Sequence, residues 1–104
     1  MEKYKLILRH IALNDLQEIY EHIAHNLNET EVAEKIHGSI VEAISSLSEL
    51  PLRHQVIDVE PYRTVGYRML HIRSYVIFYI VDQEKSAVHI VRILYNRREW
   101  QNIL

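Results

Sequence analysis

The spacing of apolar residues changes along the chain from a strand-like run to the period of a helix. Residues Tyr4–Arg9 form a short, mostly apolar run, which predicts a first strand. From about Ala12 the apolar residues recur three and four positions apart, which is typical of one face of a helix. These residues are Leu16, Ile19, Tyr20, Ile23 and Leu27. Asn14 and Gln17 resemble the first turn of this helix.

A second amphipathic helix follows after a few polar residues. Asn28, with Glu31 three positions later, suits its start. Pro51 ends it, because the proline ring cannot continue the backbone hydrogen bonds of a helix. Its apolar stripe consists of Val32, Ile36, Ile40, Ile44 and Leu47. Two such helices with a short connection predict an antiparallel helical hairpin.

The second half of the chain is dominated by strand-like runs. Residues 52–66 are polar and irregular and predict no element. Tyr67–Ile72, Tyr75–Val81 and Ala87–Tyr95 then predict three strands, with a polar turn at residues 82–86. The middle run, YVIFYIV, is apolar at every position, as expected of a central strand that is covered on both faces.

The order strand, helix, helix and three strands predicts an α+β fold, with the helical hairpin packed on an antiparallel sheet. Arg97–Leu104 predict a short terminal helix or tail. We expect its Trp100, Ile103 and Leu104 to cover part of the second face of the central strand, and a bound partner to cover the rest. The length of 104 residues, with two glycines and two prolines, indicates one domain over residues 1–104.

Composition excludes several classes of protein. The formal net charge of -2 means that any contact with nucleic acid needs a local basic patch. Without cysteine there is no disulfide framework. Seven histidines occur, but no HExxH motif, so we expect no metal site and no cofactor. Because no apolar run resembles a signal peptide or a bilayer span, we expect a cytoplasmic protein with no membrane partner.

Motifs in the second half carry a family resemblance. Tyr67-Arg68, the run SYVIFY on the central strand and the run VRILYNRREW near the C-terminus follow one pattern. That pattern is similar to the arginine strand, tyrosine-rich central strand and closing R-[IV]-L-x-x-R-x-x-W run of the RelE/ParE toxin superfamily. Matches to the first helix of the family are Ala12, Asp15, Leu16, Ile19 and Ile23. The resemblance covers nearly the whole chain and implies the toxin of a type II toxin–antitoxin (plasmid stabilisation) system, a growth inhibitor held inactive by a cognate antitoxin.

The resemblance implies either of two targets, and the residues favour the ParE-like one. RelE-like members cleave mRNA on the ribosome, whereas ParE-like members poison DNA gyrase. Metal-free RNA cleavage needs a base, an acid and cations around the phosphorane. In RelE-like nucleases an arginine follows the tyrosine of the central strand, where this chain has Val76. The chain end also lacks the His or Tyr often found in nuclease relatives, and the helical hairpin is acidic.

A rearranged endoribonuclease site (mRNA interferase) remains the alternative. Its candidate catalytic residues are Arg68, Arg92 and Arg97, only if the protein is a nuclease. Arg68 and Arg92 would point from adjacent strands into one basic patch, near His71 as a proton carrier. For Arg92, and similarly for Arg68, an equally good interpretation is a structural salt bridge to a buried carboxylate. A third hypothesis is a degenerate member that binds its antitoxin and no longer inhibits growth.

Overall fold

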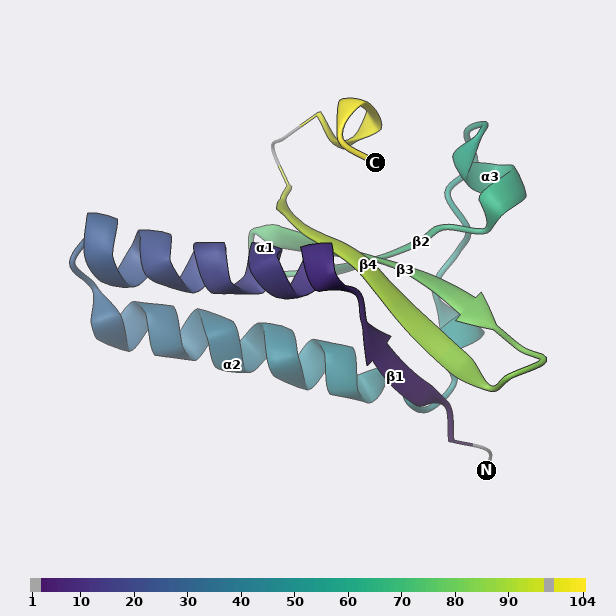
Figure 1. Ribbon diagram of the computed structural model, residues 1–104, viewed down its shortest axis with the longest axis horizontal. Helices are drawn as coiled ribbons and strands as arrows, with labels where there is room; N and C mark the ends of the chain where they lie inside the picture. Colours follow the sequence, from purple (N-terminus) through teal and green to yellow (C-terminus); the bar gives the residue numbers. More distant parts are fainter. Residues whose placement is uncertain (1–2, 97–98) are drawn as a thin grey trace.

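Two helices cover one face of a four-stranded sheet in this computed structural model, which describes residues 3–96 and 99–104 (Figure 1). The elements are β1 (Lys5–Leu8), α1 (His10–Glu21), α2 (Thr30–Ser46), α3 (Tyr62–Val65), β2 (Arg68–Ile72), β3 (Tyr75–Asp82) and β4 (Ala87–Tyr95). Single turns of other helix types lie at His22–Asn26, Pro51–Arg53 and Trp100–Asn102. The predicted α+β order is confirmed, and α3 is an additional turn within the stretch that predicted no element.

The boundaries of the helices differ from the predicted ones. α1 begins at His10, so Asn14 and Gln17 lie inside the helix and the prediction of a first turn there is wrong. The early start follows from β1, since the N–H of Arg9 still donates to Ile90 O and leaves no room for a longer connection. α2 ends at Ser46, ahead of Pro51, and Ala33 rather than Val32 is its first buried residue.

The sheet has the order β1-β4-β3-β2 and is mixed. β2 and β3 pair antiparallel, as do β3 and β4, whereas β1 runs parallel to β4. The direction follows from the connection, because two antiparallel helices return the chain to the end of the sheet where β1 began (Figure 1). β2 therefore runs like β1, and so does β4. The expectation of a wholly antiparallel sheet is corrected at this edge.

A β-bulge interrupts the pairing of β3 with β4. Phe78 pairs with Arg92 and Tyr79 pairs with Ile90, which leaves Val91 as the extra residue. Because of this insertion Ile90 and Ile93 lie on the same face of the sheet, although they are three positions apart. Ile93 is buried whereas Val91 is only half-buried, so the side chains of β4 do not simply alternate between the two faces at the bulge.

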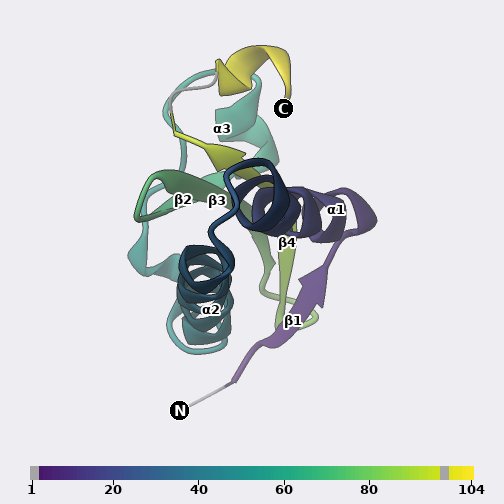
Figure 2. The same ribbon diagram turned by 90° about the vertical axis from the view of Figure 1, so that its left-hand side faces the viewer.

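The sheet carries an apolar core on each face. Towards the helices, Leu16 and Ile40 pack against Ile77 and Ile90. On the other face, the core consists of Ile57, Val76, Phe78 and Leu94, with Tyr62, Tyr67, Met69, Trp100, Ile103 and Leu104 packed against it. Figure 2 shows the C-terminal turn and α3 across the sheet from α2. The predicted cover by the C-terminal tail is confirmed. In the part of the chain that the structure describes, no helix is long and apolar enough to cross a bilayer.

Candidate functional site

Arg92, a candidate catalytic residue, is engaged with Asp15 of α1. Its Nε lies 2.7 Å from Asp15 Oδ2 and its Nη2 lies 2.9 Å from Asp15 Oδ1, a two-point contact between the guanidinium and the carboxylate. The two side chains are 19% and 10% exposed. The hydrogen bond that Arg92 donates to Asp15 raises the pKa of Arg92, so the guanidinium stays charged although it is partly buried.

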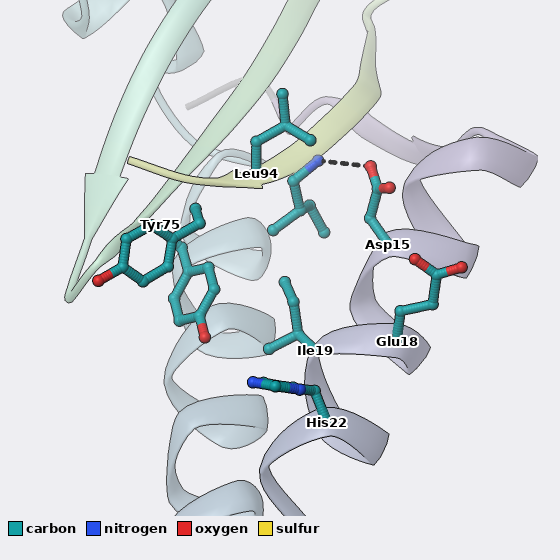
Figure 3. A pocket seen from close by; sticks show the side chains of 8 residues that line it. Asp15, Glu18, Ile19, His22, Tyr75 and Leu94 are labelled. Atoms are coloured by element: carbon teal, nitrogen blue, oxygen red, sulfur yellow. Dashed lines mark hydrogen bonds between the residues drawn. The ribbon is translucent and has the colours of Figure 1, made fainter. Parts of the chain in front are cut away.

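The same carboxylate also accepts a hydrogen bond from a backbone N–H at the edge of the sheet. β1 pairs with β4 only as far as Ile90, and beyond that point α1 lies beside β4 instead of a strand. The N–H of Ile93 therefore has no strand partner on that side, and it donates to Asp15 Oδ2 over 3.0 Å (Figure 3). Asp15 thus links α1 to β4 through three hydrogen bonds, which matches the structural interpretation of Arg92.

Arg68, the second candidate, holds the loop that follows α2. Its Nη1 donates to the carbonyl oxygens of Leu52, at 3.3 Å, and of His54. Beside it, the hydroxyl of Tyr79 donates to Pro51 O over 2.8 Å. Burial raises the pKa of Tyr79 to about 12 despite the opposing effect of Arg68 and Arg53, so this hydroxyl remains a donor at neutral pH. Arg68 and Tyr79 together fix residues 51–54 to the sheet.

His54 is the titratable group of this region that the sequence did not single out. Its Nε2 is buried and has no hydrogen-bond partner among the described residues. Burial, followed by the charges of Arg53, Arg68 and His71, lowers its pKa. The imidazole is therefore neutral at pH 7 and packs edge-on against the ring of Tyr79, with centroids 6.4 Å apart. The Arg53-His54 pair in an irregular segment gave no periodic signal from which this could be read.

The arginines do not form one patch. β3 separates β2 from β4, and Arg68 pairs with Tyr79 whereas Arg92 pairs with Phe78. Consecutive residues of a strand face opposite sides of the sheet, so Arg68 and Arg92 project from opposite faces. The prediction of a shared patch from adjacent strands is wrong. Arg97 lies outside the described residues.

The position that carries an arginine in the RelE-like nucleases lies in the apolar core of the second face. Val76 is 3% exposed and pairs with Leu94. The indole of Trp100 lies over the neighbouring Phe78, with ring centroids 5.5 Å apart. Water and a phosphate group are thereby kept from this part of the central strand. Within residues 3–96 and 99–104, no three His, Cys, Asp or Glu side chains gather as metal ligands would.

An open cavity of about 450 Å³ lies between α1 and the end of β4. Its lining residues are Asp15, Glu18, Ile19, His22, Tyr75, Ile93, Leu94 and Tyr95. Figure 3 shows two tyrosine rings across the cavity from Ile19, His22 and the carboxylates of α1. The rings of Tyr75 and Tyr95 meet edge to face with centroids 5.7 Å apart. Burial, and then Tyr95, raises the pKa of Tyr75, so its hydroxyl is protonated at neutral pH.

Comparison with known proteins gives one family for the sequence. The model of the family described as "ParE toxin of type II toxin-antitoxin system, parDE" matches residues 6–100. No curated protein matches the chain.

Solved structures of toxin–antitoxin systems share the fold. The chromosomal ParDE system from P. aeruginosa superposes with a TM-score of 0.73 and 24% identity, covering 91% of this chain and 98% of that one. The RelBE2 complex from Mycobacterium tuberculosis gives a TM-score of 0.70 and 23% identity, covering 91% of this chain and 93% of that one. The intact E. coli RelBE complex gives a TM-score of 0.57 and 19% identity, covering 91% of this chain and 99% of that one. At these identities the likeness concerns the fold.

Proposed function

The chain belongs to the ParE toxin family of type II toxin–antitoxin systems, and from this membership we propose that it inhibits growth by binding DNA gyrase until a cognate antitoxin neutralises it. In this proposal the protein acts by binding and carries out no chemistry of its own. The RelE-like alternative, cleavage of mRNA on the ribosome, needs cationic side chains that are free to meet a phosphate.

The observation that carries the proposal is the engagement of the described candidate arginines. Arg92 is bound by Asp15, and Arg68 by backbone carbonyls of the loop that follows α2. They lie on opposite faces of the sheet, so they cannot act on one phosphate together. Val76 adds an apolar side chain where the nuclease relatives have a cation. A toxin that acts by binding needs none of these groups to be free.

Exposed apolar side chains on the helices support an antitoxin partner. Those that are 40% exposed or more on α1, α2 and their connection are Ile11, Leu13, Leu27, Val32 and Val41. An amphipathic segment of a partner covers such side chains favourably, because it removes their apolar surface from water. The chain would then reach its target only when the antitoxin is released or degraded.

The test is induction of the chain in a bacterial host, alone and together with the product of the short reading frame that we expect beside its gene. We expect growth arrest with the chain alone and growth with both. The purified chain, incubated with gyrase and plasmid DNA, should trap cleaved DNA–gyrase complexes. In a translating extract it should leave mRNA intact. Codon-phased mRNA cuts would favour the ribosome-dependent nuclease, and growth without arrest would favour a degenerate member.

A further inference from the structure

The cavity between α1 and the end of β4 combines aromatic walls with an unmatched negative charge. On one side of the cavity, the ion pair with Arg92 neutralises the charge of the buried Asp15 carboxylate. Glu18 is exposed and has no ion-pair partner among the described residues, although its charge helps to raise the pKa of Arg92. Of the lining residues that the structure describes, none is a lysine or an arginine. This part of the lining therefore carries a net negative charge beside two tyrosine rings.

A guanidinium group fits this combination better than other side chains. It is planar, so it stacks on an aromatic ring, and its forked N–H groups match a carboxylate. Tyr95 is 39% exposed and offers such a ring at the mouth of the cavity. Glu18 lies on α1, across the cavity from Tyr75, as Figure 3 shows. An ammonium group is more strongly hydrated and gains less from the ring.

The charge of the helices points to the source of that side chain. Residues 10–46 contain seven carboxylates and a single lysine. A partner segment that runs along this hairpin is therefore favoured when it is basic. The exposed apolar residues of the helices, including Leu27 next to the turn that contains His22, lie on the same hairpin. Apolar contacts would hold such a segment, and the cavity would select for its charge.

We propose that this cavity is a specificity pocket that receives an arginine side chain of the antitoxin, between Glu18 and the Tyr75–Tyr95 pair. The proposal rests on the proposed function for the identity of the partner, but not for the chemistry of the pocket. The guanidinium lies against the ring of Tyr95 and donates to the carboxylate of Glu18. Ile19 contacts the aliphatic part of the arginine side chain.

The first experiment tests the pocket without the antitoxin. The probes are N-acetyl-arginine amide, its neutral isostere N-acetyl-citrulline amide and N-acetyl-lysine amide, titrated to tens of millimolar into the ¹⁵N-labelled chain. We expect backbone shifts confined to Glu18, Ile19, His22 and Tyr95, with the arginine amide binding at least about threefold more tightly than the other two. Shifts scattered over the surface, or an equal response to citrulline or lysine, would overturn the proposal.

The second experiment uses the antitoxin that we expect to be encoded beside the gene. Glu18→Gln should weaken its binding by about threefold, and Tyr95→Leu by about tenfold, by the usual strengths of exposed ion pairs and cation–π contacts. Glu34→Gln removes the same charge from an exposed site of the same hairpin, on α2 outside the cavity, and should weaken binding clearly less than Glu18→Gln does. Thermal unfolding of each variant shows whether it is folded.

The outcomes separate the two proposals. If the neighbouring protein binds the native chain and both pocket variants equally well, the antitoxin pairing stands and the pocket assignment is wrong. If it binds none of them, the antitoxin pairing fails with the proposed function, and the amide titrations alone then decide whether the pocket takes a guanidinium. An equal loss of binding in Glu34→Gln and Glu18→Gln would assign the effect to general charge and would also contradict the pocket.

Discussion

Asp15 is the one buried charged residue in the part of the chain that the structure describes, and its replacement by alanine should strongly destabilise the protein. Removing one partner of a buried ion pair costs about 3–5 kcal/mol, because the other charge stays in a poorly solvated site. Arg92 is 19% exposed, so water can reach it partly and the lower end of that range applies. The unpartnered N–H of Ile93 adds to the loss. We expect Asp15→Ala to reduce the free energy of unfolding by about 3 kcal/mol.

Asp15→Asn separates the contribution of the negative charge from that of the hydrogen bond to the N–H of Ile93. The amide oxygen can still accept from the N–H of Ile93, but the charge that holds Arg92 is gone. We expect the free energy of unfolding to fall by about 2 kcal/mol, so that the stability lies between that of the native protein and that of the alanine variant. In a domain of this size each kcal/mol lowers the melting temperature by about 4–8 °C, so the two variants can be distinguished by thermal unfolding. Glu34→Ala, on an exposed site of α2, is the matched control and should change stability by no more than about 0.5 kcal/mol.

A double-mutant cycle with Arg92→Met checks that the loss arises from the pair. The free energy of unfolding is measured in urea for Asp15→Ala, for Arg92→Met and for the variant that carries both changes. Directly bonded partners should show a coupling energy of about 1.5–3 kcal/mol, so the double variant should be much less destabilised than the sum of the single ones. A coupling below about 0.5 kcal/mol would refute the view that Arg92 is primarily a structural residue.

Three further predictions concern the loop that follows α2 and the second face of the sheet. Tyr79→Phe should lower the free energy of unfolding by about 1 kcal/mol in urea titrations, because Pro51 O loses its buried donor. The pKa of His54 is lowered in the folded protein, so the unfolded chain binds a proton at this imidazole more readily. The free energy of unfolding should therefore fall as the pH drops below about 6.5. His54→Phe should flatten this pH dependence in melting curves. Val76→Arg should destabilise the protein by several kcal/mol, of the order found for an unpaired buried charge, and should produce no mRNA cleavage in a translating extract; cleavage would contradict our view of that face.

The periodicity of the sequence was sufficient for the two long helices, the four strands and much of the core. The helical spacing identified α1 and α2, and the apolar run YVIFYIV identified a central strand with two covered faces. The start of α1 was missed because Asn14 and Gln17 resemble a helical first turn wherever they occur, whereas the true start depends on how closely β1 leads into the helix. The partner of β1 was also missed, since pairing between strands far apart in the chain leaves no local pattern.

The candidate site was less predictable, because its contacts are long-range. Arg92 and Asp15 are 77 positions apart, and neither carries a local signal for the other. The bulge at Val91 matters as well, since one inserted residue changes which side chains of β4 face the helices. The cavity depends on α1 replacing a strand beside the end of β4, which follows from the tertiary arrangement.

The pairing of Asp15 with Arg92 also bears on how the family motifs should be interpreted. Asp15 belongs to the stretch that resembles the first helix of the RelE/ParE toxins, and Arg92 opens their closing R-[IV]-L run. In this protein the two residues meet, and they join the first helix to the last strand where β1 has ended. An arginine in that run therefore has a sufficient structural reason to be there. It is therefore weak evidence for nuclease activity.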